Sequence, residues 1–93
     1  MAAAPHDSDA QLLTDIDLSI LGADRETFCR FEKNVRREYW WVPSPLFRQK
    51  RATILQSFLS RSSVYATAQF QERLESAARR NLTEAITALI GVP

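Results

Sequence analysis

Apolar residues recur three and four positions apart along most of this chain, and the alternation of β-branched residues expected for strands is absent. This spacing is typical of amphipathic helices, and it predicts an all-α fold. The chain has only two glycines, at positions 22 and 91. We expect about four helices in a single helical domain over residues 8–90, approximately at 8–21, 24–39, 44–60 and 67–89.

The expected helix ends follow from short polar residues, proline and glycine. The side chains of serine, threonine and aspartate can accept a hydrogen bond from the first free backbone N–H groups of a helix. The residues in this position are Ser8, Asp24, Ser44 and Thr67. Pro45 suits the first turn of the third helix, where its missing N–H has no partner to lose. Gly22 stands where a residue in the left-handed conformation would end the first helix.

The sequence TDIDLSILG, residues 14–22, places two aspartates in an aliphatic run. On a helix with 100° per residue, one side carries Leu13, Ile16, Ile20 and Leu21. Asp17 falls between the last two of these, whereas Asp15 faces nearly the opposite way. We therefore expect Asp17 to point into the core and Asp15 to lie on the wetter side.

The other helices also carry a polar residue within their apolar stripes. The stripes are Phe28, Phe31, Val35 and Tyr39 around Glu32, then Phe47, Ile54 and Phe58 around Arg51, and finally Phe70, Leu74, Ala77, Ala85 and Ala88 around Asn81. A buried charge without a partner costs several kcal/mol, out of a total stability of roughly 5–15 kcal/mol. We expect a buried network in which Arg51 pairs with Asp17 or Glu32 and Asn81 completes the hydrogen bonds.

A sharper interpretation of the same residues makes Asp17 a metal ligand and Arg51 a phosphate clamp. Carboxylate oxygen suits hard cations, and a guanidinium matches phosphate with two parallel hydrogen bonds. His6 and Asp7 form a second candidate metal pair, although they lie in an alanine-rich N-terminal tail, residues 1–7, that we expect to be disordered and solvated.

Charge and composition narrow the classes of function. Twelve basic and eleven acidic residues among 93 give a net charge of +1, so no overall field attracts nucleic acid or an anionic membrane. No apolar run is long enough to span a membrane, and the first residues lack the regions of a signal peptide. The single cysteine, Cys29, cannot form an intrachain disulfide. We expect a cytoplasmic protein.

The segment VRREYWWVP, residues 35–43, places basic side chains beside Trp40 and Trp41. These rings could stack on nucleic-acid bases or anchor a partner protein. Tryptophans in this setting more often close one end of a core or dock onto protein, so protein binding is favoured and nucleic-acid binding is not.

Several stretches together resemble the second half of a group of small bacterial proteins in the HD superfamily of metal-dependent phosphohydrolases. In that group LLTDIDLSILGA resembles a pattern of the form F-L-D-x-D-L-x-I-L-G. Further matches in the same order are VRREYWWVP, FRQKRATILQSFLSR, VYAT and ERLESAARRNL, which together span the chain from about residue 9 onward. The resemblance implies a partial HD-type helical bundle.

The superfamily holds one or two divalent metals with a histidine, a His-Asp pair and a final aspartate. By resemblance the final aspartate is Asp17, with Asp15 as the second choice, and the metal is manganese, iron, magnesium or zinc. We infer that Arg51 would hold the substrate phosphate or orient Asp17. The upstream histidine and His-Asp pair are absent from this sequence, and His6-Asp7 lies too close to Asp17 to replace the pair.

These residues lead to two hypotheses. The first is a C-terminal segment of an HD-type phosphohydrolase that hydrolyses phosphate esters or nucleotides only when its other ligands are supplied. The alternative is a non-catalytic helical module for protein interaction or oligomerisation. Both predict that the chain forms a homo-oligomer or docks onto a missing N-terminal half, because a half-bundle exposes apolar surface.

Overall fold

The computed structural model describes residues 8–91, and all the regular structure in this range is helical. The elements are α1 (Ser8–Asp17), the 3₁₀ helix η1 (Leu18–Gly22), α2 (Arg25–Glu38), α3 (Ser44–Leu59) and α4 (Ala68–Ile90). The prediction of an all-α fold is confirmed. The expected tail over residues 1–7 lies outside the described residues. None of the described helices is both long enough and apolar enough to cross a membrane.

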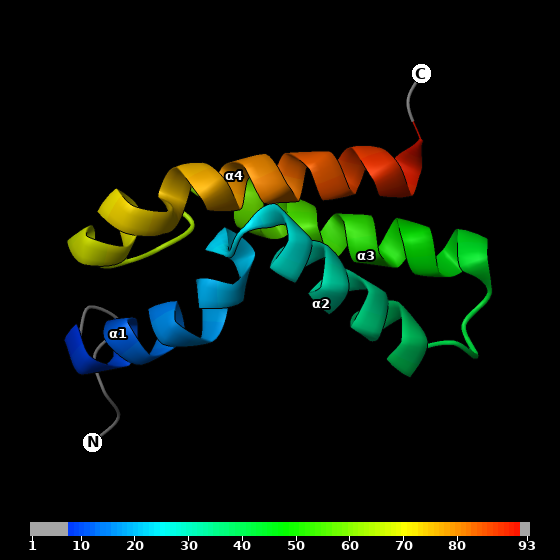
Figure 1. The fold of residues 1–93 in the computed structure, drawn as a ribbon, viewed down its shortest axis with the longest axis horizontal. Coiled ribbons are helices and arrows are strands. Elements are labelled where there is room, and N and C mark those ends of the chain that lie inside the picture. The colour runs from blue at the N-terminus through cyan, green and yellow to red at the C-terminus, as the bar shows by residue number, and fades with distance from the viewer. Residues whose placement is uncertain (1–7, 92–93) are drawn as a thin grey trace.

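The two longest helices, α3 and α4, form the centre of the fold. They lie side by side and run in opposite directions, joined through residues 60–67 (Figure 1). The 3₁₀ helix η1 packs against α4, and α1 and α2 extend from it to either side (Figure 1). Because η1 joins α1 to α2, its contact with α4 fixes where α1 ends and where α2 starts.

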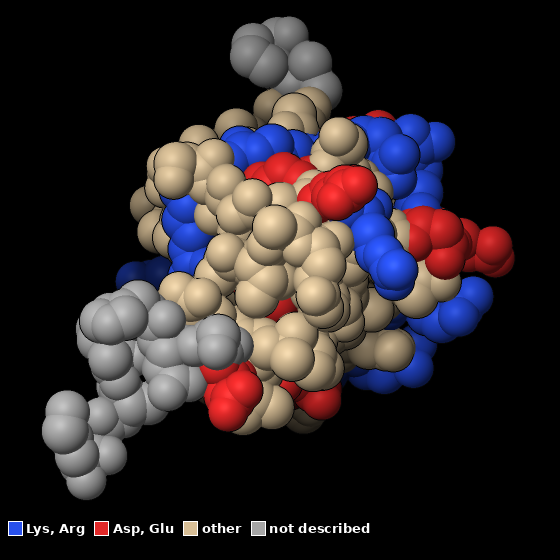
Figure 2. Space-filling model, turned by 90° about the vertical axis from the view of Figure 1, so that its left-hand side faces the viewer, with Lys and Arg blue, Asp and Glu red and all other residues tan. Residues whose placement is uncertain are grey.

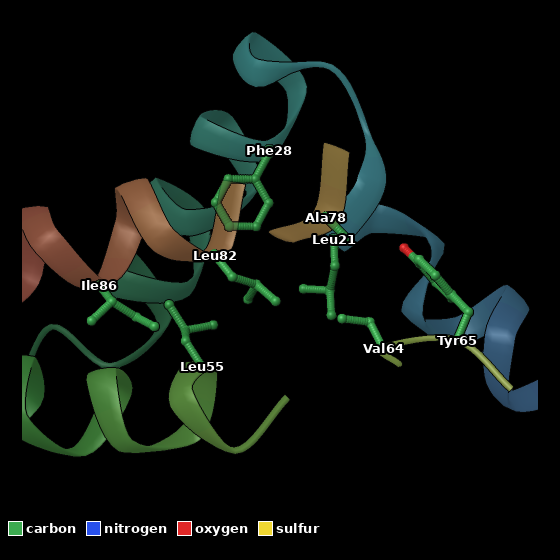
Figure 3. Close-up of a cluster of buried hydrophobic side chains, with 8 residues drawn as sticks. All are labelled: Leu21, Phe28, Leu55, Val64, Tyr65, Ala78, Leu82 and Ile86. Carbon is green, nitrogen blue, oxygen red and sulfur yellow. The ribbon is translucent and has the colours of Figure 1, made fainter. Parts of the chain in front are cut away.

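One apolar cluster joins η1, α2, α3, α4 and the segment that precedes α4 (Figure 3). Its buried members are Leu21, Phe28, Leu55, Val64, Tyr65, Ala78, Leu82 and Ile86. The predicted stripes of α3 and α4 are therefore wrong in detail, since Ile54 is 48% exposed and Ala88 is exposed, whereas Leu55 and Ala78 are buried. The physical reason is that α3 packs mainly against α4, so its buried face is narrow and follows that one neighbour.

The predicted caps are confirmed only in part. Asp24 caps α2 as expected, because its Oδ2 accepts a hydrogen bond of 3.1 Å from the backbone N–H of Thr27. Ser44 does not cap α3: it is the first helical residue, after Pro43, and its hydroxyl accepts a bond from Arg36. Thr67 does precede α4, but its hydroxyl donates to Asp15 rather than capping its own helix.

Gly22 is needed for close packing and not for a left-handed backbone. Among residues 8–91 the only glycine with positive φ is Gly91, which follows α4 at φ 81°. A Cβ added to Gly22 would lie 2.7 Å from Cβ of Leu74 and 2.9 Å from the hydroxyl oxygen of Tyr65. Glycine at this position therefore lets η1 approach α4 closely.

Candidate functional site

The two aspartates of α1 lie on opposite sides from those predicted. Asp15 is 1% exposed, whereas Asp17 is exposed to solvent. The expectation that Asp17 points into the core is therefore wrong. The cause is partly local: after Asp17 the α-helix tightens into the 3₁₀ helix η1, in which residues three apart share a face. The inward-facing line of this segment accordingly runs through buried Asp15, partly buried Leu18 and buried Leu21, at spacings of three.

Asp15 is buried because it accepts three hydrogen bonds from the chain just before α4. Its Oδ1 accepts from the N–H of Ala66 at 2.8 Å, and its Oδ2 accepts from the N–H and the hydroxyl of Thr67 at 2.7 and 2.6 Å. Burial alone would raise the pKa of Asp15, but these hydrogen bonds outweigh it and hold the pKa below its ordinary value. Asp15 is thus an ionised structural group that joins α1 to the start of α4.

A second carboxylate, on α4, accepts hydrogen bonds from the same connecting segment. Glu75 on α4 accepts bonds from the backbone N–H groups of Val64, at 2.8 Å to Oε2, and Tyr65, at 3.3 Å to Oε1. Arg79, one turn further along α4, donates to Glu75 at 2.8 Å and to three backbone carbonyls within residues 59–62. Sequence analysis did not single out Glu75 or Arg79. Their only available sign was the position of both residues in the stretch ERLESAARRNL.

Tyr65 connects the same segment before α4 to η1. Its hydroxyl donates to the carbonyl oxygen of Leu18 at 3.0 Å. Burial, together with the nearby charges of Glu75 and Asp15, raises the pKa of Tyr65 to about 12. The phenol therefore remains protonated near neutral pH and acts as a donor that fixes η1 to the segment before α4.

Asp17 has no such role. Among residues 8–91 it makes no side-chain hydrogen bond or ion pair, and it lies beside Leu13 and Ile16, which are 64% and 50% exposed. Figure 2 views the end of the molecule that holds α1, and uncharged side chains cover most of its centre, with acidic and basic side chains around them. The outer face of α1 thus exposes two aliphatic side chains beside Asp17, a carboxylate that has no partner among residues 8–91.

The predicted buried network separates into two unconnected parts. Arg51 pairs with Glu32, with Nε 3.1 Å from Oε1, and the two side chains are only 14% and 18% exposed. Asn81 is fully buried, but its amide donates to the carbonyls of Leu21 and Ala23 at 3.0 and 2.7 Å. Asp17 belongs to neither part. Of the two expected partners of Arg51, Glu32 is confirmed and Asp17 is wrong, because Asp17 is exposed to solvent on α1 and Arg51 is already paired.

The tryptophans do not close the core. Trp40 and Trp41 are 76% and 65% exposed, in the turn between α2 and α3. Arg36 stabilises this turn by donating to the carbonyls of Tyr39 and Val42 at 3.2 and 3.1 Å. Its guanidinium also lies 4.6 Å from the ring centre of Phe47. The turn therefore presents two large rings to solvent on an ordered backbone.

The described residues do not form a metal centre. No group of three or more histidine, cysteine, aspartate or glutamate side chains is suitably placed within residues 8–91. His6 and Asp7, the other candidate pair, lie outside the described residues. Because a catalytic zinc site, for example, takes three protein ligands and an open position, the residues seen here do not fit a metal by themselves.

Comparison with known proteins gives no relative for this chain. No protein-family model, no curated protein and no solved structure matches it. The resemblance to HD-type phosphohydrolases therefore depends on the quoted motifs alone.

Proposed function

We propose that this chain is a helical docking segment related to the C-terminal part of an HD-type metal-dependent phosphohydrolase, and that it does not hydrolyse phosphate esters by itself. The observation that supports this most is the orientation of α1. This helix buries a carboxylate, Asp15, and exposes two large aliphatic side chains, Leu13 and Ile16. A helix that turns one of its apolar sides outward is explained if other helices cover that side in a complete bundle.

The two aspartates of the TDID motif then have separate roles. Asp15 is already occupied by three hydrogen bonds within the fold. Asp17 stands on the apolar face of α1 without a partner among residues 8–91, and is open to groups brought by a docking chain. This division favours Asp17 over Asp15 as the residue that corresponds to the final aspartate of the HD pattern.

Arg51 receives a structural role in the proposal. Its guanidinium already binds both carboxylate oxygens of Glu32, in a site that is largely closed to solvent. Binding a phosphate there would require breaking this pair and leaving Glu32 without its cation, which is costly in a partly buried site. We therefore do not retain Arg51 as a substrate ligand.

The proposal is tested by extending the chain. The coding sequence upstream of Met1 should contain, in frame, helical segments that carry the histidine and His-Asp pair. The longer protein, loaded with manganese or iron, should hydrolyse p-nitrophenyl phosphate, and Asp17→Asn should abolish this activity. Glu72→Gln, a matched change at an exposed carboxylate on α4, should leave it intact. Activity that survives Asp17→Asn, or turnover by residues 1–93 alone, would contradict the proposal.

A second candidate function is self-association through the turn between α2 and α3, and the exposure of Trp40 and Trp41 favours it. Sedimentation velocity over a range of concentrations distinguishes the two possible interfaces, the turn and the exposed face of α1. If Trp40→Ala with Trp41→Ala abolishes dimers and Leu13→Ser with Ile16→Ser does not, the turn is the interface. The opposite result assigns the interface to α1, and a monomer at every concentration rules out self-association.

A further inference from the structure

A groove lies between α2, α3 and α4, on a different part of the fold from Asp17. Its volume is about 410 Å³. Its apolar lining includes Phe28, Phe47, Ala85, Ala88 and Leu89. The groove exists because α2 is fixed to η1 at its start and slopes away from α4 toward its end (Figure 1). Two ion pairs, Arg25–Glu84 and Arg51–Glu32, connect α2 to its neighbours across this space.

The charges around the groove are not balanced. Both acidic residues in its lining are already paired, Glu32 with Arg51 and Glu84 with Arg25. The basic residues in the lining that remain are Lys33, Arg36 and Arg48. Within residues 8–91 none of these three has a carboxylate oxygen within 4.0 Å, and the hydrogen bonds of Arg36 go to uncharged oxygens. An apolar groove with three uncompensated cations favours an anionic occupant.

The size of the groove decides between a small molecule and a protein segment. Binding sites for small molecules usually enclose about 300–1,000 Å³, with a mostly apolar lining and a few convergent polar groups. An α-helix with its side chains is about 10–12 Å across and exceeds a groove of this volume within one turn or two. The groove therefore fits a compact small molecule better than a docked helix.

We propose that this groove binds a small amphipathic anion, with an apolar chain or ring packed between Phe28, Phe47 and Leu89. Its carboxylate or phosphate head group lies toward Lys33, Arg36 and Arg48. Neither head group forms a covalent bond with the protein, so binding is reversible and requires no co-reactant. The proposal is independent of the relation to phosphohydrolases, because it uses none of the residues of α1.

The experiment is a titration of ¹⁵N-labelled protein followed by NMR, with three ligands that share one ten-carbon chain. Decanoate and decyl phosphate should shift the amide signals of groove residues saturably, and decyltrimethylammonium should bind at least tenfold more weakly. Binding of both anions assigns a general anion site. Binding of only one identifies the head group. Equal binding of the cation, or no saturable binding of either anion below its micelle concentration, overturns the proposal.

Variants locate the site. Ala88→Trp should fill the groove and weaken decanoate binding at least tenfold. The control is Thr87→Trp, at the preceding position of α4, which is also exposed but lies outside the groove lining, and it should leave binding unchanged. Lys33→Glu combined with Arg48→Glu should weaken binding of both anions about tenfold. The control is Arg37→Glu with Arg73→Glu, which changes the net charge equally at exposed positions outside the lining. Equal effects of a variant pair and its control refute the site.

Discussion

Replacing Asp15 by alanine should destabilise this protein far more than the same change at Asp17. Asp15→Ala removes the acceptor of three short hydrogen bonds, from the N–H of Ala66 and from the N–H and hydroxyl of Thr67. Asp17→Ala changes the same kind of residue two positions away, where the side chain is exposed and makes no side-chain bond among residues 8–91. Comparing the two variants separates the effect of losing the contacts of Asp15 from the effect of losing any aspartate of α1.

The expected size follows from the bonds that are lost. Hydrogen bonds to a charged group contribute roughly 1.5–3 kcal/mol each. Three such bonds are offset by the cost of burying the carboxylate, several kcal/mol, and the freed N–H of exposed Ala66 can bond to water. We expect a net loss of about 3 kcal/mol for Asp15→Ala, a large share of a typical domain's roughly 5–15 kcal/mol. Asp17→Ala should stay within about 0.5 kcal/mol of the parent.

Urea denaturation followed by circular dichroism measures both changes. At a slope of about 1 kcal/mol per molar urea, Asp15→Ala should lower the midpoint by roughly 3 M with the slope unchanged. Equal midpoints for the two variants would refute the assignment of Asp15 as the structural carboxylate. A midpoint lowered only by Asp17→Ala would show that the sequence-based orientation of α1 was right after all.

The dependence of the unfolding free energy on pH provides a second test of Asp15. The pKa of Asp15 in the folded protein lies below its ordinary value of 3.8. The unfolded chain therefore takes up the proton first, so the stabilisation is complete above about pH 4 and is lost as the pH falls through the lower folded value. The gap in unfolding free energy between the parent and Asp15→Ala should narrow from pH 5 to pH 3. A gap that stays constant over this range would contradict an ionised Asp15.

Two further changes test the packing. Gly22→Ala should cost about 1–3 kcal/mol by thermal denaturation, because the new methyl group would clash with Leu74 and Tyr65; a change below 0.5 kcal/mol would show that η1 can move away from α4. Arg51→Met should cost about 2 kcal/mol by leaving Glu32 partly buried without its cation, and adding Glu32→Met should recover part of that loss. Additive losses in the double variant would mean that the pair is not coupled.

The number and limits of the helices could be predicted because they depend on nearby residues. Asp24 caps the helix that follows it, and Pro45 lies in the first turn of α3, so both helices start within a residue of the predicted position. The pairing of Arg51 with Glu32 could also be foreseen, as one of two options. Both residues interrupt apolar stripes on consecutive helices, and such a charge needs a partner.

The orientation of α1 could not be predicted from its own residues. Aliphatic side chains lie on two sides of it: Leu13 and Ile16 on one, and Leu12 and Leu18 on the other. A helical wheel has no basis for choosing between such sides when both are apolar. The choice is made by the backbone N–H groups at 66 and 67, which need an acceptor and lie about fifty residues further along the chain.

The hydrogen-bond partners of Asn81 could not be predicted for a similar reason, although its burial was expected. Its amide donates to the carbonyls of Leu21 and Ala23, which become available because η1 ends there and no further helical turn supplies N–H donors to them. A wheel drawn for α4 contains no information on where another helix stops. Polar residues inside an apolar stripe thus indicated that a partner exists, but not that the partner would be backbone.

The orientation of α1 also bears on function. Turning α1 about its axis to bury Leu13 and Ile16 would gain about 1.5–3 kcal/mol for each side chain fully covered, but it would withdraw Asp15 from three donors. Within residues 8–91 the hydrogen bonds prevail and the aliphatic side chains remain in water. A partner that covers this face removes the conflict, because Asp15 keeps its donors while Leu13 and Ile16 become buried. The same contact would enclose Asp17, so whatever docks there must offer that carboxylate a cation or a set of donors.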